Sequence, residues 1–245
     1  MEFTEWAPYY DAIRREFGFR MERERASADR LLALLSPASR ADPLARLRAR
    51  LEDREVVVVG LAPRAGAPPL WRLPPGRPRV ALVAADGAAR RCLDAGLVPE
   101  VIVTDLDGPV ASEVLANSKG AFVLVHAHGD NVPELERWVP EFSGEVGGSW
   151  AGPPEPGLLD VGGFTDGDRA ACLAVHLRAS RVLLWGFDFE RTEEEDTQAR
   201  AVKLAKLAWA RRVVAVLARG KVPVRLWRPD GTIVPYPEPS GPSTQ

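Results

Sequence analysis

Short apolar runs alternate with helix-like segments through the middle of the chain, from about residue 54 to residue 219. The runs are rich in Val, Leu, Ile and Ala, and they lie at 56–59, 80–84, 101–103, 121–125 and 181–185. Runs this apolar are typical of parallel strands that helices cover on both faces, because a half-exposed strand would alternate apolar and polar residues. We therefore predict an α/β fold with a mostly parallel, doubly wound, Rossmann-like sheet.

Helical and hairpin patterns flank this region. Apolar side chains between Trp6 and Phe17 recur at intervals of three and four, which predicts helix, and we interpret their aromatic rings as core or dimer contacts. The C-terminal residues predict a β-hairpin around a Pro-Asp-Gly turn and then a disordered tail rich in Pro and Ser. The predicted organisation is an N-terminal helical segment at 1–53, an α/β catalytic domain at 54–219, and a hairpin and tail at 220–245.

The composition excludes several classes of protein. The net charge of −2 over 245 residues gives no general attraction to nucleic acid or to an anionic membrane. No stretch approaches the roughly 20 apolar residues of a membrane span, and no apolar leader opens the chain. Cys92 and Cys172 lack metal-ligand spacing, so we interpret both as buried free thiols. We expect a cytoplasmic protein with no nucleic-acid or membrane partner.

Acidic residues follow two of the predicted strands at the point where each strand ends. Asp105 and Asp107 follow the run 101–103, and Asp86 follows the run 80–84. Residues two apart in an extended chain point the same way, so Asp105 and Asp107 are expected side by side at the carboxyl edge, where α/β sheets bind ligands. Carboxylates held together repel unless a cation lies between them, and Mg²⁺ that also binds substrate phosphates is the natural partner. The alternatives are turn chemistry for Asp-x-Asp-Gly and an N-cap role for Asp86.

Two of the three histidines follow the strand predicted at 121–125. The sequence there is His-Ala-His-Gly-Asp-Asn, and its spacing is expected to point His126, His128 and Asp130 in one direction. Ligation of zinc or iron is one interpretation of this cluster. Hydrogen bonding to triphosphate oxygens is the other, and it makes Asp130 and Asn131 candidate nucleotide contacts.

A glycine-rich segment precedes a predicted helix that contains Cys172. Gly162 and Gly163 would let backbone N–H groups approach a phosphate at the helix N-terminus. Thr165 or Asp166 would cap this helix. Because acids beside a phosphate need a cation between them, Asp166 is a candidate metal ligand and Arg169 a candidate phosphate contact. The alternative is a well-capped helix after a flexible turn.

Two further segments carry candidate residues. Asp188 follows the strand at 181–185, and a long helix is predicted at about 197–218. Lys203 and Lys206 lie on neighbouring turns of that helix. Their side chains are either solvated or reach across to phosphates.

The motifs occur in one order along most of the chain, and in that order the chain resembles the archaeal-type 6-hydroxymethyl-7,8-dihydropterin pyrophosphokinases. That family is itself similar to the catalytic domain of thiamin pyrophosphokinase. The motifs are Asp86-Gly, Val103-Thr-Asp-Leu-Asp-Gly, His126-Ala-His-Gly-Asp-Asn, Gly162-Gly-Phe-Thr-Asp-Gly-Asp-Arg and Gly186-Phe-Asp-Phe.

The resemblance implies Mg²⁺-dependent transfer of diphosphate from ATP to the hydroxymethyl group of a reduced pterin, with release of AMP, in tetrahydromethanopterin or folate biosynthesis. The metal-binding acids of the thiamin enzymes correspond to Asp86, Asp105, Asp107 and Asp166. Under this hypothesis the histidines orient phosphates or help to remove the hydroxyl proton. A carboxylate would match the amino-pyrimidinone edge of the pterin, and the candidates are Asp168 and Asp188. By analogy with the thiamin enzymes, a homodimer is one option for the assembly.

Three other functions are open at this point. A phosphatase of the haloacid-dehalogenase type would use Asp105 as a covalent nucleophile and Asp107 as a general acid. A thiamin pyrophosphokinase-like diphosphotransferase would act on another acceptor. A non-enzymatic nucleotide-binding module would need fewer carboxylates than the chain offers.

Overall fold

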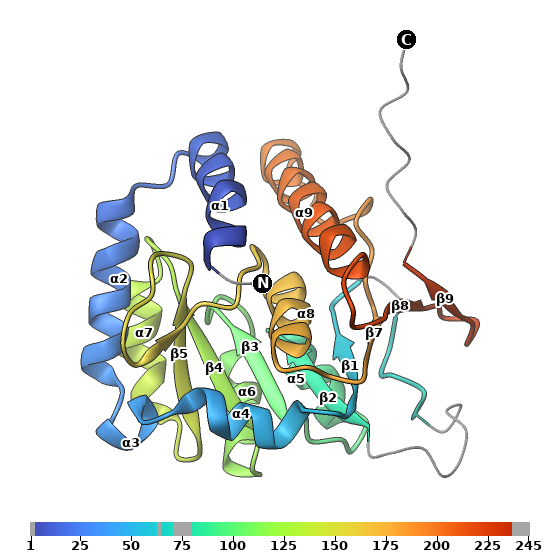
Figure 1. Cartoon of the computed structure of the whole chain (residues 1–245), viewed down its shortest axis with the longest axis horizontal. Helices are drawn as coiled ribbons and strands as arrows, with labels where there is room; N and C mark the ends of the chain where they lie inside the picture. The colour runs from blue at the N-terminus through green and yellow to red at the C-terminus, as the bar shows by residue number, and fades with distance from the viewer. Residues whose placement is uncertain (1–2, 63–64, 71–79, 237–245) are drawn as a thin grey trace.

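The computed structural model describes residues 3–62, 65–70 and 80–236, and within these ranges it contains one nine-stranded sheet (Figure 1). The strand order is β6-β5-β4-β3-β2-β1-β7-β8-β9. The strands are β1 (Glu55–Val59), β2 (Ala81–Ala85), β3 (Val101–Thr104), β4 (Phe122–Ala127), β5 (Val146–Trp150), β6 (Leu158–Leu159), β7 (Arg181–Trp185), β8 (Val224–Trp227) and β9 (Ile233–Pro235). From β1 the chain therefore builds the sheet outward to β6 and then returns to the other side of β1.

Every neighbouring pair in this sheet is parallel except β8 and β9. The antiparallel pair joins Leu226 to Val234 and forms the C-terminal hairpin that the Pro-Asp-Gly turn predicts. The mostly parallel α/β fold and the hairpin are thus confirmed. The predicted tail at the C-terminus lies outside the described residues from 237 onward.

Helices cover both faces of the sheet. The helices are α1 (Phe3–Phe17), α2 (Met21–Leu34), α3 (Pro37–Arg40), α4 (Pro43–Leu51), α5 (Ala88–Asp94), α6 (Val110–Ser118), α7 (Val132–Trp138), the 3₁₀ turn η2 (Val139–Glu141), α8 (Asp166–His176) and α9 (Thr197–Ala218). Val56 and Val58 pack in one apolar layer with residues of α1, α4, α8 and α9. Val57 and Val59 pack in the other, with residues of α2, α5, α6 and α7, because successive side chains of a strand point to opposite faces.

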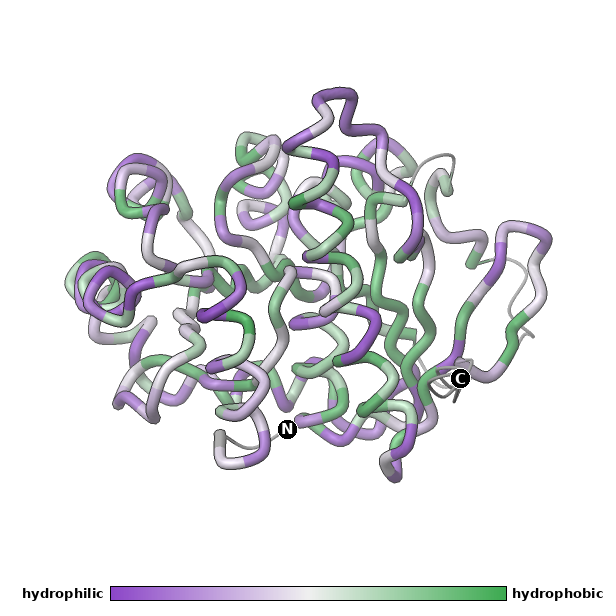
Figure 2. Tube along the Cα trace, turned by 90° about the horizontal axis from the view of Figure 1, so that it is seen from above, coloured by the Kyte–Doolittle hydropathy of each residue, from purple (hydrophilic) through white to green (hydrophobic). Residues whose placement is uncertain are grey.

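The local sequence explains where these elements form. The central strands are β-branched and buried along their whole length, and the interior of the molecule is accordingly hydrophobic while its outer helices and turns carry polar residues (Figure 2). Asp42 accepts a hydrogen bond from the Ala45 N–H at 3.0 Å and caps α4, with Pro43 in the first turn. No described helix is both long and apolar enough to cross a membrane.

The sequence pattern did not predict β5 and β6. Strand β5 reads Val-Gly-Gly-Ser-Trp, in which two glycines and a serine interrupt the apolar run that predicts a strand. Its glycines are required by packing, because a Cβ on Gly147 would lie 2.9 Å from the Phe122 ring and one on Gly148 only 2.4 Å from Leu158. Contacts made far away in the sequence therefore decide this strand. The division of the chain into three segments stays a prediction, and Cys92 and Cys172 are buried free thiols as interpreted.

Candidate active site

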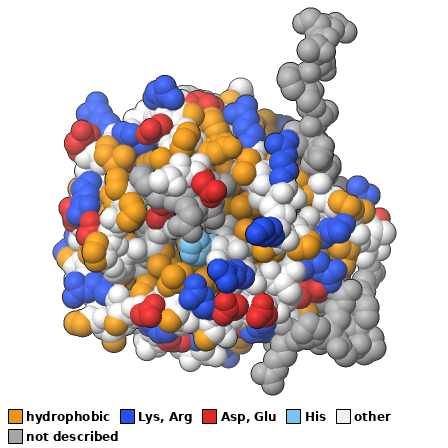
Figure 3. Space-filling view, in the orientation of Figure 1, with side chains coloured by type: hydrophobic (Ala, Val, Ile, Leu, Met, Phe, Trp, Pro, Cys, Tyr) orange, Lys and Arg blue, Asp and Glu red, His pale blue; other side chains and the backbone are white. Residues whose placement is uncertain are grey.

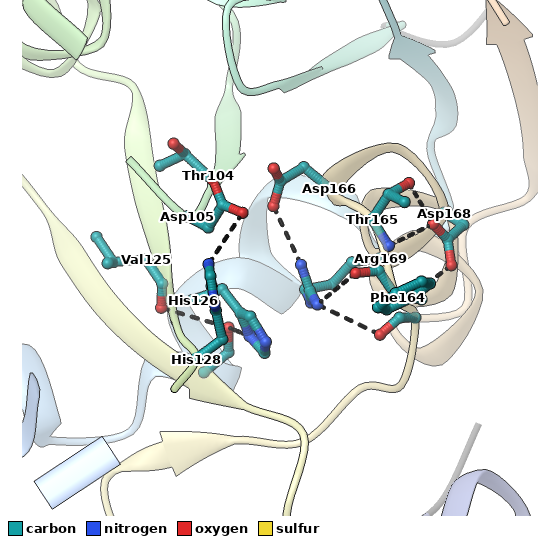
Figure 4. A network of polar contacts seen from close by, with 12 residues as sticks. Thr104, Asp105, Val125, His126, His128, Phe164, Thr165, Asp166, Asp168 and Arg169 are labelled. Carbon is teal, nitrogen blue, oxygen red and sulfur yellow. Dashed lines mark hydrogen bonds and ion pairs between the residues drawn. The ribbon is translucent and has the colours of Figure 1, made fainter. Parts of the chain in front are cut away.

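The carboxyl ends of three neighbouring strands and the start of α8 carry the predicted site residues. Asp86 follows β2, Asp105 follows β3, and His126 lies near the end of β4. Figure 4 shows Asp105 and the two histidines of the β4 end on one side, and Asp166 and Arg169 of α8 approaching them from the other. Parallel strands end at one edge of the sheet, which is why residues so far apart in the sequence meet here.

Asp105 and Asp107 come together through a turn and not through strand alternation. Strand β3 ends at Thr104, and Leu106 has a left-handed backbone with φ of 69°. The Leu106 N–H donates to Thr104 Oγ1 at 2.9 Å, and the Asp107 N–H donates to Asp105 Oδ1 at 3.3 Å. Left-handed geometry is costly for a branched residue and is concentrated at functional sites. The prediction that extended spacing aligns the two carboxylates was wrong in its mechanism, although the carboxylates do lie close together.

Asp86 lies against the backbone of Gly108. Asp86 also has a left-handed backbone, with φ of 46°, and its N–H donates to the Val103 carbonyl at 2.8 Å. A Cβ at Gly108 would lie 2.2 Å from Asp86 Oδ1, so a larger residue after Asp107 would displace the Asp86 carboxylate. Asp86 Oδ1 is buried and has no hydrogen-bond partner among the described residues, and the side chain of Glu113 lies within hydrogen-bonding reach of the Asp86 carboxylate. The Asp86 carboxylate therefore lies directly against the Asp-Leu-Asp-Gly turn at Gly108.

The carboxylates raise one another's pKa. Removal of water and the charges of Asp105 and Asp86 raise the pKa of Asp107 to about 6. Burial, and then the charge of Asp105, raise the pKa of Asp166 well above its usual range. Burial and the charge of Asp105 also raise the pKa of Asp86. These acids thus form one negatively charged centre, which favours a cation.

Asp105 is the acid of this centre that stays ionised most readily. Burial alone would raise its pKa, but the hydrogen bond and charge of His128 and the charge of Arg169 outweigh burial and lower the pKa to about 2. His128 Nε2 lies 3.3 Å from Asp105 Oδ2, and His128 Nδ1 lies 2.5 Å from Asp130 Oδ1. Burial opposes protonation of His128, but its bond to Asp105 leaves the pKa of the imidazole raised.

His126 is the neutral partner of this histidine pair. Burial, and then the charges of Arg169 and His128, lower its pKa well below the usual range. Its Nδ1 lies 3.1 Å from Ser149 Oγ, and the Ser149 hydroxyl donates to the Val125 carbonyl at 3.3 Å. Because that hydroxyl hydrogen is already used, we assign the ring proton to Nδ1, which leaves Nε2 as an acceptor.

Arg169 is held rigidly at the start of α8. Its guanidinium donates to Asp166 Oδ1 at 3.1 Å and to the carbonyls of Gly163 and Phe164 at 3.3 and 3.1 Å. Gly162 and Gly163 both have positive φ, and a Cβ on Gly163 would lie 2.4 Å from Arg169 Cα. The glycine pair therefore allows the loop to fold closely over the arginine.

Asp168 and Asp188 do not reach the centre. Asp168 is sealed from solvent and accepts hydrogen bonds from the N–H groups of Phe164 and Thr165, both at 2.7 Å, and from the Thr165 hydroxyl. It is the capping-box residue of α8. Asp188 accepts from Arg191 Nε at 2.7 Å and from two N–H groups of its own turn. Hydrogen bonds within the protein thus occupy both acids, and the structure offers no support for the predicted contacts of either with a pterin.

Asn131 connects the strand ends and does not face outward to a ligand. Its Nδ2 donates to the carbonyls of Asp105 and His126 at 2.9 and 2.8 Å. Its Oδ1 accepts from the His128 N–H at 3.1 Å and from the Ser27 hydroxyl of α2 at 2.9 Å. All the hydrogen-bonding capacity of the amide is therefore used within the protein. Asn131 positions Asp105 and both histidines, and its predicted contact with nucleotide stays a prediction.

Lysines of α9 lie beside the acids, as the sequence allowed. The charge of Lys203 lowers the pKa values of Asp86 and Asp107, so this side chain lies within electrostatic reach of both. Lys206 lines a recess that also contains Asp105 and Arg169. The predicted contact of these lysines with nucleotide phosphates stays a prediction.

Sequence reasoning missed Glu113. It lies on α6 with 0% exposure, and the Thr104 hydroxyl donates to its Oε1 at 3.1 Å. Burial, and then the charge of Asp86, raise its pKa to about 9, so the side chain is protonated at neutral pH. Its position three residues after Val110, on the apolar face of the helix, was the available signal.

The donor set fits a hard divalent cation. Within the described ranges, no three His, Cys, Asp or Glu side chains form a ready-made metal cage. Mg²⁺ does not need such a cage, because it binds one or two carboxylates and completes its shell with water and substrate phosphates. The buried Oδ1 of Asp86 and the mutual repulsion of the acids suit that mode of binding. Zinc ligation by the histidines is less suited, because His128 contacts two carboxylates and Nδ1 of His126 contacts Ser149.

The fold and the site define a doubly wound α/β protein with an acidic centre at the carboxyl edge of its sheet. The chain belongs to the family described as "6-hydroxymethylpterin diphosphokinase MptE-like", whose model matches residues 31–194. The haloacid-dehalogenase interpretation is therefore replaced by the pyrophosphokinase resemblance.

Curated relatives carry the same description. The chain is 31% identical over 232 residues to the 6-hydroxymethyl-7,8-dihydropterin pyrophosphokinase of Methanocaldococcus jannaschii, covering 89% of this chain and 96% of that protein. It is 34% identical over 239 residues to the enzyme of the same name from Methanothermobacter thermautotrophicus, covering 93% and 100%. Among solved structures, thiamine pyrophosphokinase from Bacillus subtilis matches with 14% identity and a TM-score of 0.37, over 71% of this chain and 60% of that one.

Proposed function

We propose that the protein transfers diphosphate from ATP to the hydroxymethyl group of 6-hydroxymethyl-7,8-dihydropterin, with Mg²⁺ as the metal and AMP as the second product. The observation that carries this proposal is the gathering of Asp86, Asp105, Asp107 and Asp166 beside Arg169 at one edge of the sheet. The names of the curated relatives support the acceptor and the type of transfer.

The acids and the basic side chains have complementary roles in this proposal. Carboxylates from among these four aspartates would hold one or two Mg²⁺, and the metal, when bound, would neutralise the ATP phosphates and help to align them. Arg169 would donate to the transferred diphosphate, since its guanidinium is fixed by Asp166 and two carbonyls before substrate arrives. Lys203 would add positive charge from α9. Transfer of this kind depends mainly on alignment and charge neutralisation.

His126 is the candidate base that takes the proton from the hydroxyl group of the pterin. The hydroxymethyl oxygen attacks the β-phosphorus of ATP, the bond from that phosphorus to the bridging oxygen of the α-phosphate breaks, and AMP leaves with that oxygen. The proton of the hydroxyl group moves to His126 Nε2, which is the free acceptor of a neutral imidazole. His128, bound to Asp105, keeps that acid ionised.

An AMP-release assay tests this function. Protein, Mg²⁺, ATP and 6-hydroxymethyl-7,8-dihydropterin are expected to give equal amounts of AMP and pterin diphosphate, whereas ADP would indicate transfer of a single phosphoryl group. Thiamin in place of the pterin tests the alternative acceptor. Absence of AMP with the pterin, or AMP only with thiamin, would overturn the assignment.

Asp107→Asn tests the acidic centre within the same assay. Loss of this carboxylate is expected to lower kcat at least about 100-fold while the fold is kept, because a charge that aligns the metal and phosphates is removed. Asp29→Asn is the matched control, since Asp29 lies on the exposed side of α2 and pairs with Arg25. Near-normal turnover by Asp107→Asn would remove Asp107 from the metal site.

A further inference from the structure

An aromatic recess adjoins the acidic centre, and its aromatic side chains have no role in the phosphate chemistry proposed above. Its walls include Trp6 and Tyr10 of α1, Phe19 between α1 and α2, Glu24 in the first turn of α2, and Phe164 of the glycine-rich loop. The recess has a cavity volume of about 80 Å³. Figure 3 shows a histidine side chain near the middle of the face drawn, with hydrophobic, basic and acidic side chains around it.

Residues of the proposed reaction centre line the same recess. Asp105, His126, His128 and Arg169 line it together with the aromatic residues. A flat molecule in this space would therefore have one end among aromatic rings and the other end at the acids and histidines. This is the arrangement that an acceptor of a diphosphate group needs.

The aromatic side chains of the recess pack against one another and against neighbouring rings. The rings of Trp6 and Tyr10 stack with centroids 6.2 Å apart. Phe164 packs against Phe17 and Phe19 with centroids 5.2 and 6.2 Å apart. Aromatic faces that are fixed before the ligand arrives bind a flat heterocycle at low entropic cost.

Glu24 is a buried acid with unused hydrogen-bonding capacity. It is 4% exposed although it lies in the first turn of α2. Its Oε1 accepts from the Gly129 N–H at 3.0 Å, and its Oε2 accepts from the Tyr10 hydroxyl at 3.1 Å. A carboxylate offers about four lone-pair positions, so each oxygen can accept one more hydrogen bond.

Trp6 adds an unused donor to the same wall. Its side chain is fully buried, and its Nε1–H has no hydrogen-bond partner among the described residues. A buried polar group without a partner is uncommon and costs stability. A ligand atom that accepts from this N–H would remove the cost.

We propose that this recess binds the pterin ring and that Glu24 recognises it, in place of the aspartates expected from the sequence. The Glu24 carboxylate accepts from the 2-amino group and from N3–H of the ring, which are adjacent donors, and the Trp6 indole N–H donates to a ring acceptor. The hydroxymethyl group lies at the opposite end of the bicycle and so faces Asp105 and His126. This inference rests on the proposed function for the identity of the ligand.

Two ligands without the reactive hydroxyl test the recess by calorimetry. One is 6-methyl-7,8-dihydropterin, and the other is the lumazine analogue, in which a carbonyl replaces the 2-amino donor. The wild-type protein is expected to prefer the pterin, because the analogue turns an acceptor toward the Glu24 carboxylate. Glu24→Gln turns an amide donor toward the donors of the pterin, so it is expected to weaken pterin binding about 10- to 100-fold. The ratio of pterin to lumazine affinity is expected to fall to near one or to reverse.

Controls separate recognition from support of the fold. Glu22→Gln makes the same change on an exposed position of α2 and is expected to bind both ligands like the wild-type protein. Trp6→Phe keeps an aromatic ring and removes the N–H, and it is expected to weaken both ligands while leaving binding of Mg²⁺ and ATP unchanged. In turnover assays, Glu24→Gln is expected to raise KM for the pterin and to leave KM for ATP within about twofold.

The outcomes are distinguishable from those of the AMP-release assay. Unchanged pterin affinity and preference in Glu24→Gln would overturn the inference even if the wild-type protein releases AMP. A lower melting temperature with the pterin preference intact would make Glu24 only a brace between α1, α2 and Gly129, and would overturn it as well. Glu24-dependent pterin binding without AMP release would uphold the recess and overturn the proposed function.

Discussion

Replacing Asn131 with Ala offers the sharpest test of how the site is assembled. The Asn131 amide is buried and makes four hydrogen bonds of 2.8 to 3.1 Å. They reach the carbonyls of Asp105 and His126, the N–H of His128 and the hydroxyl of Ser27. Alanine at this position would leave all four groups without their partner.

The magnitude follows from these four bonds. Each hydrogen bond contributes about 1 kcal/mol to stability, and the four buried partners would stay unpaired in the variant. Summing the four losses, Asn131→Ala is expected to lower the free energy of unfolding by about 3 to 4 kcal/mol. For a chain of this size, 1 kcal/mol shifts the melting temperature by about 2 to 4 °C, which predicts a fall of roughly 6 to 16 °C. Turnover is expected to fall too, because Asp105 and His126 lose their common support.

Urea and thermal unfolding measure this loss, and Ser27→Ala is the graded control. Ser27→Ala removes one of the four bonds and is expected to cost about 1 kcal/mol. Asn131→Asp keeps the oxygen that accepts two hydrogen bonds, but its second carboxylate oxygen would face two carbonyl oxygens in place of the amide NH₂. At neutral pH this variant is therefore expected to be at least as unstable as Asn131→Ala. The reasoning is refuted if Asn131→Ala unfolds within about 1 kcal/mol of the wild-type protein, or if Ser27→Ala costs as much as Asn131→Ala.

Two further variants probe the groups behind the acidic centre. Folded Glu113 keeps its proton up to about pH 9, whereas the unfolded chain releases it near 4.5, so the folded state binds more protons between these values. The free energy of unfolding in EDTA is therefore expected to fall as pH rises through this window, by up to about 1.4 kcal/mol per pH unit. Glu113→Gln should flatten this part of the pH profile of stability. Identical profiles for the wild-type protein and the variant would contradict the buried, protonated state of Glu113. Gly108→Ala would place a Cβ 2.2 Å from Asp86 Oδ1, so Mg²⁺-dependent AMP release should fall steeply while circular dichroism still reports a folded protein. Normal AMP release by this variant would show that Asp86 can move without loss of activity.

The sequence alone determined the architecture and most of the acidic centre. Apolar runs such as 56–59 and 101–103 are strands for local reasons, because β-branched residues without polar alternation suit a sheet buried on both faces. Once the strands are parallel, residues just after them must meet at one edge, so Asp86 and Asp105 could be placed together without coordinates.

The tertiary structure decided what each polar side chain does there. Asp168 and Asp188 resemble the site acids in sequence, but hydrogen bonds of their own loops occupy them. Glu24 lies in a run of charged residues, which is a pattern that predicts a solvated helix face. Glu113 is a single acid in an otherwise apolar helix, and the sequence gives it no partner. Whether a charged side chain is solvated, paired or buried depends on neighbours that fold against it from elsewhere in the chain, and for Glu24 those neighbours are Tyr10 and Gly129. Local sequence patterns predict where strands lie because the steric preferences of residues act over a few positions. The desolvation and pairing of a charged side chain, by contrast, arise only when distant segments of the chain pack together.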